Sequence, residues 1–255
     1  MEDRWQIWSS GGGTQSTAIA VLILKGLLPR PDYAFIADTG RETQETWDYL
    51  DNVTNPALAK IGLVVERLED PSRPGVFNSH GTLIIPAFLS ASATQPANKL
   101  TNFCSSKWKR DFVKRVALQR GLLPAVNWIG ISTDEQRRIS TPRAQNWLLR
   151  YPLVFDYRAS RNDCINLIEE FGWPKAPKSS CWMCPNRRDA QWIHLRDTRP
   201  DEFQAAVKFD KELRNQRPDA YLHDSRTPLG EVEFKVAGED GHGQLALCDS
   251  GECFV

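Results

Sequence analysis

The chain of 255 residues is long enough for one α/β domain with an appendage and a full hydrophobic core. Its 32 lysines and arginines balance 32 aspartates and glutamates, which excludes a chain-wide positive field, so any basic surface must be local. The sequence has no long apolar run and no N-terminal apolar segment, so we expect a soluble cytoplasmic protein with no membrane partner.

The first predicted elements are a strand and a helix joined by glycines. An apolar run ends at Ile7 and Trp8, and we expect a helix from Thr17 to Leu27, capped by Ser16 or Thr14. Glycines allow positive φ and carry no side chain, so backbone N–H groups can close around an anion at the positive end of the helix dipole. The predicted phosphate-binding residues are Ser10, Gly11, Gly12, Gly13, Thr14, Gln15 and Ser16.

The next elements continue the alternation of strand and helix. We expect strands at 33–37 and 63–68, and between them a helix over 43–61 that Pro56 interrupts. This order predicts an α/β fold with a doubly wound, mainly parallel sheet, in which ligands lie outside the carboxyl ends of the strands. Asp38, Thr39 and Gly40 fall at the same edge as the glycine turn, which indicates a nucleotide site there.

The rest of the chain predicts a smaller appendage. We expect a long loop over 70–98, acting as a lid, with an apolar patch at 83–89, and later a strand at 125–131 and a polar turn at 132–140. Further helices are expected over 107–120, 160–171, 187–196 and 201–214, and a loop-like tail from about Thr227. The predicted domains are an α/β core over 1–160 and a cysteine-containing helical extension over 161–255.

Cysteine spacing indicates a metal site rather than a disulfide scaffold. Cys181 and Cys184 form a Cys-x-x-Cys followed by proline, and Cys104 begins a basic helix whose dipole favours a thiolate. The predicted metal ligands are Cys104, Cys181, Cys184 and Cys248, with Cys253 as an alternative for the last position. An iron–sulfur cluster and a structural Zn²⁺ both suit these thiolates. Cys164 is expected in the core, and the histidines form no metal-spaced pair.

Residues 11–16 resemble the pyrophosphatase loop of the adenine-nucleotide α-hydrolase-like superfamily (PP-loop, HUP-type fold), whose usual form is Ser-Gly-Gly-x-Asp-Ser. Gly11 stands where the superfamily has the first serine, and Gln15 stands where it has aspartate. Glutamine at this position is similar to the phosphoadenosine phosphosulfate reductase-like branch. It supplies no charge for Mg²⁺, which weighs against metal-assisted cleavage of ATP.

Three further segments resemble this family in the same order. Asp38-Thr39-Gly40, followed by Glu45-Thr46-Trp47, is similar to its Asp-Thr-Gly…Pro-Glu-Thr signature. Residues 130–138 resemble a block that lines the nucleotide pocket, which implies that Arg137 and Arg138 hold phosphate or sulfate. The order of Cys104 before Cys181 and Cys184 resembles the cysteines that hold a [4Fe-4S] cluster in adenylyl-sulfate reductases, with one ligand missing.

The resemblance leaves three functions open. The first is an enzyme that binds ATP with Mg²⁺ and cleaves it to AMP and pyrophosphate for adenylation and sulfur transfer, with Ser16 and Gln15 at the reacting phosphate. The second is a sulfonucleotide reductase, whose substrate is an adenylyl sulfate and whose nucleophile is Cys253. The third is a non-catalytic nucleotide- and zinc-binding subunit of a defence or CRISPR-type complex. The acceptor would be a nucleic acid or a protein, and a homodimer is left open.

Overall fold

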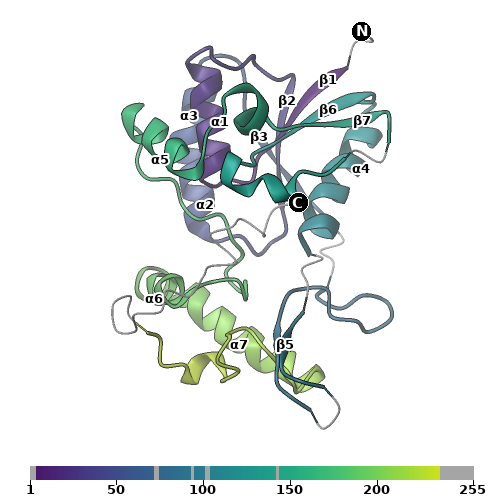
Figure 1. Cartoon of the computed structure of the whole chain (residues 1–255), viewed down its shortest axis with the longest axis vertical. Helices are drawn as coiled ribbons and strands as arrows, with labels where there is room; N and C mark the ends of the chain where they lie inside the picture. Colours follow the sequence, from purple (N-terminus) through teal and green to yellow (C-terminus); the bar gives the residue numbers. More distant parts are fainter. Residues whose placement is uncertain (1–3, 72–74, 93–94, 101–103, 142–143, 236–255) are drawn as a thin grey trace. The chain divides into compact units, whose positions relative to one another are not determined.

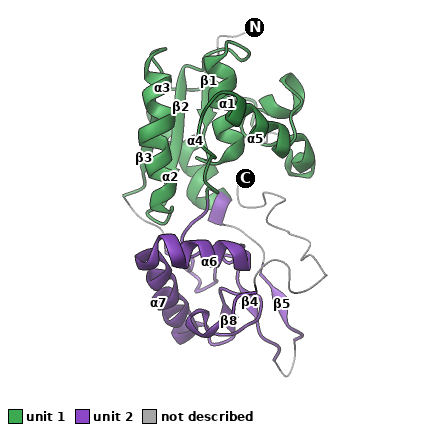
Figure 2. Ribbon diagram, turned by 90° about the vertical axis from the view of Figure 1, so that its left-hand side faces the viewer, with its two compact units in different colours: residues 1–73, 106–179, 254–255 green, residues 74–105, 180–253 purple. Residues whose placement is uncertain are grey.

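The computed structural model describes residues 4–71, 75–92, 95–100, 104–141 and 144–235. Contacts divide them into two compact units (Figure 2). Unit 1 holds the described parts of 1–73 and 106–179, and unit 2 holds those of 74–105 and 180–253. The prediction placed one boundary at 160. The observed units instead exchange segments. A strand within 74–105 pairs with one strand from the second half of the chain, and residues of 161–179 belong to the apolar core of unit 1.

Unit 1 is built on one parallel sheet, as predicted. Its strands are β1 (Trp5–Ser9), β2 (Tyr33–Asp38), β3 (Val65–Glu69), β6 (Ala125–Ile129) and β7 (Trp147–Arg150). The order across the sheet is β3-β2-β1-β6-β7, and every neighbouring pair is parallel. This confirms the mainly parallel α/β fold. The edge strand β7 was not predicted, because its four residues are too few to show a period.

Helices cover both faces of this sheet (Figure 1). One face carries α1 (Thr14–Leu24), α2 (Gln44–Tyr49), α3 (Asn55–Ala59) and α5 (Arg161–Glu170), which share a buried apolar cluster. The other face is covered by α4 (Asp111–Gln119), whose Phe112, Val113 and Ala117 pack on Ile7 and Phe35. The predicted interruption at Pro56 is a five-residue π-helical turn, Leu50–Thr54, directly before α3, so the helix continues past the proline.

Unit 2 combines two helices with a small sheet. α6 (Asp189–Thr198) and α7 (Pro200–Gln216) accompany the antiparallel strands β4 (Phe88–Leu89), β5 (Asn98–Lys99) and β8 (Ala220–Tyr221). A buried carboxylate ties α7 to the segment after it. Asp210 accepts hydrogen bonds from the backbone N–H groups of Leu222 at 3.0 Å and Leu229 at 2.8 Å, and it pairs with Arg214.

The prediction of a plain loop over 70–98 was wrong in its second half. Leu83, Ile85 and Ala87 are buried, and β4 pairs with β8 from more than a hundred residues later in the chain. The apolar patch is therefore part of a core, which a sequence reading could not distinguish from a lid surface. Within the described residues, no helix is both long and apolar enough to cross a bilayer.

Candidate functional site

Residues 10–13, called the glycine loop below, lie between the end of β1 and the start of α1, at the carboxyl edge of the parallel sheet. Its backbone is held by short local bonds. The N–H of Gly11 donates to Oγ of Ser16 at 2.7 Å, and the N–H of Gly12 donates to Oγ of Ser10 at 3.2 Å. Gly12 has φ of +72°, and a Cβ there would lie 2.6 Å from Cγ2 of Thr46. The loop therefore needs glycine at position 12 for two separate reasons.

α1 begins at Thr14, three residues before the predicted start, with Gly13 in the N-cap position. No side chain caps the helix, so the expected capping by Ser16 or Thr14 was wrong. Ser16 is instead engaged by Gly11. Within the described residues, the backbone N–H groups of Gly13, Thr14, Gln15 and Ser16 have no hydrogen-bond acceptor, and the first turn carries no acidic residue. These four donors at the positive end of α1 form a nest for an anion.

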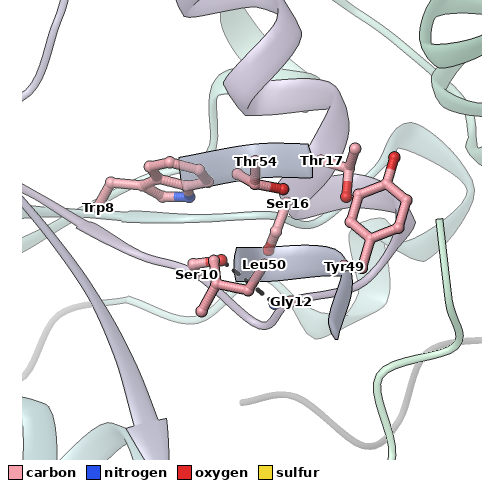
Figure 3. Close-up of a pocket in the computed structure, with 8 residues that line it drawn as sticks. All are labelled: Trp8, Ser10, Gly12, Ser16, Thr17, Tyr49, Leu50 and Thr54. Atoms are coloured by element: carbon pink, nitrogen blue, oxygen red, sulfur yellow. Dashed lines mark hydrogen bonds between the residues drawn. The ribbon is translucent and has the colours of Figure 1, made fainter. Parts of the chain in front are cut away.

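A small cavity lies behind the loop, and Figure 3 shows the residues around it. It is lined by Trp8, Ser10, Gly12, Ser16, Thr17, Tyr49, Leu50 and Thr54. Its volume of about 10 Å³ holds no more than one water molecule. Desolvation in this region also raises the pKa of the Tyr49 phenol to about 12. This cavity is therefore too small for a phosphate group.

On one side of the loop, the end of β2 brings Asp38, Thr39 and Gly40 to the same sheet edge, as predicted from the order of elements. The N–H of Gly40 donates to Oδ1 of Asp38 at 2.7 Å. Burial, together with the negative charges of Glu42 and Glu69, raises the pKa of Asp38, although the Gly40 hydrogen bond opposes this. A half-buried carboxylate among other acids is suited to accept hydrogen bonds from hydroxyl groups or to approach a cation.

Glu42, which the sequence analysis did not single out, shapes this side of the site. Its carboxylate accepts hydrogen bonds from the backbone N–H of Thr39 at 3.0 Å and the Thr39 hydroxyl at 2.8 Å. Lys109 lies 3.0 Å from its other oxygen. Burial alone would raise the pKa of Glu42, but the Lys109 charge and the Thr39 hydrogen bonds together lower it. Arg41 stacks 4.5 Å above Trp108, so two contacts join the 39–42 loop to the π-helical turn Ser106–Arg110.

On the other side of the loop lies the end of β6. A Cβ at Gly130 would touch Ser16, and Nε2 of Gln15 lies 3.4 Å from Oγ of Ser132. The two arginines predicted to hold phosphate or sulfate, Arg137 and Arg138, lie in different surroundings. The side chain of Arg138 is 7% exposed and donates to Glu135 at 2.7 Å, and burial raises the pKa of the Glu135 carboxyl group despite the nearby guanidinium. Arg137 is exposed. In this arrangement the Arg138 guanidinium pairs with the buried Glu135, and the predicted contact of Arg137 and Arg138 with phosphate or sulfate stays a prediction.

Arg161 and Ser179 also contact the loop, and both were missed. Nη1 of Arg161 lies 3.4 Å from Oε1 of Gln15, and its backbone N–H donates to Asp134 at 2.9 Å. The hydroxyl of Ser179 donates to the carbonyl oxygen of Gly11. A signal for Arg161 was available, since Ser160-x-x-Asp163 is a capping box that places Arg161 in the first turn of a helix. Ser179 carries no local signal.

The three described cysteines of the predicted metal site all lie in unit 2 and are partly exposed. Cys181 and Cys184 share a tight turn, in which the N–H of Cys184 donates to the Cys181 carbonyl at 3.1 Å and Arg187 donates to the same oxygen. Cys248 and Cys253 lie outside the described residues. Cys164 is fully buried, as expected, and burial raises the pKa of its thiol to about 12.

Two of these cysteines lie next to segments of unit 1 in the sequence. Cys104 precedes Ser106, the start of the π-helical turn, by two residues, and Cys181 follows Ser179 by two residues. One of these serines contacts the glycine loop, and the other begins the turn that holds Lys109.

Comparisons with known proteins do not assign a family. No protein-family model matches the chain, and no curated protein matches it. Among solved structures, the U34-tRNA thiolase NcsA from Methanococcus maripaludis, with its [4Fe-4S] cluster, is similar over 98% of this chain and 80% of that chain, at 15% identity and a TM-score of 0.46. A likeness this distant does not identify a function. The reductase-like relationship therefore stays a prediction, and the function must be argued from this chain's own residues.

Replacing Gly12 by alanine tests the loop geometry. We expect Gly26→Ala, where φ is +69° and nothing lies within 4 Å, to lower the free energy of unfolding by about 1 kcal/mol through backbone strain alone. Gly12→Ala adds the contact with Thr46, so its loss should exceed that of Gly26→Ala by at least about 1 kcal/mol. Urea unfolding of both variants measures this difference. Equal losses would mean that the loop relaxes freely around a side chain.

A second prediction concerns pH. Because the folded-state pKa of Glu42 lies below its ordinary value of 4.5, its ionised form stabilises the fold above that value, and this stability is lost as pH falls through the folded-state pKa. Glu42→Gln should cost roughly 2 kcal/mol or more at pH 7, with the deficit shrinking below pH 4.5. Glu169→Gln, at an exposed position on α5, is the control. A deficit that does not change between pH 7 and pH 4 would exclude the ion pair as its source.

Proposed function

We propose that unit 1 binds ATP through its phosphates at the glycine loop and cleaves it between the α- and β-phosphates. The observation that carries this proposal is the run of four backbone N–H donors from Gly13 to Ser16 that have no acceptor among the described residues. Donors fixed in a helix terminus stabilise charge that builds on phosphate oxygens without needing to reorganise. The parallel sheet supports this placement, since its carboxyl edge is where such folds bind ligands.

The reaction we infer is adenylation of an acceptor for sulfur transfer. An acceptor oxygen attacks the α-phosphorus, the bond to the bridging oxygen breaks, and pyrophosphate leaves with the electron pair. A sulfur nucleophile then displaces AMP from the activated acceptor. In this scheme the loop amides and Ser16 surround the α-phosphate, and the Asp38 carboxylate accepts hydrogen bonds from the ribose hydroxyls.

In the loop that this chain resembles, the aspartate carries the charge for Mg²⁺. In this chain Gln15 stands at that position, and Arg161 would supply the positive charge instead. Gln15 lies between Arg161 and Ser132, at 3.4 Å from each, and so connects the guanidinium to the loop. Mg²⁺ bound to ATP would use phosphate oxygens, water and a carboxylate such as Asp38, because an amide brings no charge to the ion.

We further propose that Cys104, Cys181 and Cys184 hold an iron–sulfur cluster, with Zn²⁺ as the rival. Three soft thiolate donors suit either centre, and Arg187 at the Cys181–Cys184 turn supplies positive charge next to them. A cluster with three protein ligands would supply an iron site at which sulfide can bind. Cys104 and Cys181 lie two residues from Ser106 and Ser179 in the sequence.

Radiolabelled ATP tests the reaction. We expect AMP and pyrophosphate as products, and we expect Arg161→Gln to raise the Kd for ATP about 10-fold, because it removes one charge-assisted interaction. Arg158→Gln, three residues away at an exposed position, should bind ATP like the parent. Sulfite release from a sulfonucleotide would instead identify a reductase, and tight ATP binding without any product would identify a non-catalytic subunit.

Cysteine variants test the metal centre. Replacing Cys104, Cys181 or Cys184 singly by serine should abolish metal retention after anaerobic purification, measured by metal analysis and by visible absorption, which distinguishes iron–sulfur from colourless zinc. Cys164→Ala should keep the full metal content, since that buried thiol is already packed in the core of unit 1. Full metal content in each of the three serine variants would place the centre elsewhere.

A further inference from the structure

A second concave site lies in unit 1, and it shares no lining residue with the glycine loop. It has a volume of about 230 Å³ and is the larger of the two cavities described. Residues of the α4 region form one wall, and the segment before and within β7 forms the other. The lining residues are Arg110, Asp111, Lys114, Ser140, Thr141, Ala144, Trp147 and Leu149.

The cleft follows from the topology of the sheet. The face that carries α4 has this one helix among its described elements, whereas the opposite face carries four. β7 is the edge strand, two strands away from β1, so α4 leaves it partly uncovered. Trp147 and Leu149 are consecutive residues on this face of β7, and their apolar surfaces form the floor of the cleft.

The cations of the π-helical turn Ser106–Arg110, of α4 and of Arg120 at its C-terminal end fall into two groups. Lys109, Arg115 and Arg120 each pair with an acid from another element, at 3.0 Å from Glu42, 2.6 Å from Asp70 and 2.7 Å from Glu66. These acids lie in the β2–α2 loop and in and after β3, so this group is neutralised by the rest of unit 1.

The second group keeps its positive charge. Lys107 and Lys114 form no ion pair with any described residue, and Arg110 pairs only with the adjacent Asp111. Lys107 and Arg110 belong to the π-helical turn and Lys114 to α4, and Arg110 and Lys114 line the same cleft. Since the whole chain has a formal net charge of zero, these three cations, with Asp111 as the acid beside Arg110, are a local excess of positive charge.

We propose that this cleft binds the sugar–phosphate backbone of a single nucleic-acid strand. Arg110 and Lys114 line it and Lys107 extends the charge beyond it, which fits successive phosphates. The hydroxyl groups of Ser140 and Thr141 offer hydrogen bonds to phosphate or sugar oxygens.

Binding in this cleft should show little sequence preference. Trp147 is only 5% exposed, so its ring is not available to stack on bases. Ala144 and Leu149 offer apolar contact for a sugar instead. Backbone contacts without base stacking or base edges carry no sequence information.

Fluorescence anisotropy with a labelled single-stranded oligonucleotide of about 12 nucleotides, measured without ATP across a range of salt concentrations, tests the proposal. The test variant is Arg110→Gln with Lys114→Gln, and the control is Arg115→Gln with Arg120→Gln, which removes the same charge from the same helix. We expect the test variant to bind about 10-fold more weakly at low salt, with the slope of log K against log salt reduced by about 1.4, and the control to bind like the parent.

Three results would overturn the proposal: no binding by the parent protein, equal losses in both double variants, or complete displacement of the strand by millimolar inorganic phosphate. Equal losses would mean that only total charge matters, and displacement by phosphate would identify a site for a small anion. Lys107→Gln, an exposed position outside the cleft lining, gives a third measurement that does not depend on the fold of the double variants. Arg161→Gln should leave strand binding unchanged, which separates this surface from the ATP site.

Discussion

The structure of unit 1 depends on one constraint, the need to keep a run of backbone N–H groups at the start of α1 without an internal acceptor. Four neighbours hold the loop in this form. Thr46 and Ile36 leave no room for a side chain at Gly12, Ser179 donates to the carbonyl oxygen of Gly11, and Gly130 lies against Ser16. Backbone N–H groups without an acceptor normally destabilise the folded protein. A loop held in this form is therefore suited to a ligand that supplies the acceptors.

Two ion pairs hold segments that border the proposed nucleotide site. The buried Glu42 shapes the backbone at Thr39, and its partner Lys109 belongs to the turn that follows Cys104 by a few residues. Glu135 and Arg138 form a second buried pair near the end of β6. Both pairs are held inside the fold, where breaking either partner would leave an isolated charge. The proposed nucleotide site is thus framed by internal ion pairs, and Arg161 is the cation that remains close to the loop.

The α4 helix shows how one sequence segment can serve two surfaces. Lys109, Arg115 and Arg120 pair with Glu42, Asp70 and Glu66, while Arg110 pairs only with the adjacent Asp111, and Lys107 and Lys114 form no ion pair with a described residue. Composition alone conceals this division, because the positive and negative residues of the chain are equal in number. Only the pairing of individual side chains separates structural charge from charge that is available to a partner.

The sequence by itself determined the parallel α/β fold and placed the glycine turn and Asp38 at one edge, because strand and helix periods and glycine's backbone freedom are local properties. It did not reveal the start of α1, the edge strand β7, the strand pairing of Leu89 with Ala220, or the roles of Glu42, Arg161 and Ser179. Tertiary structure decided these. A hydrogen bond from Ser179 to Gly11 joins residues 168 positions apart, and no local pattern encodes which distant side chain will fill a given space.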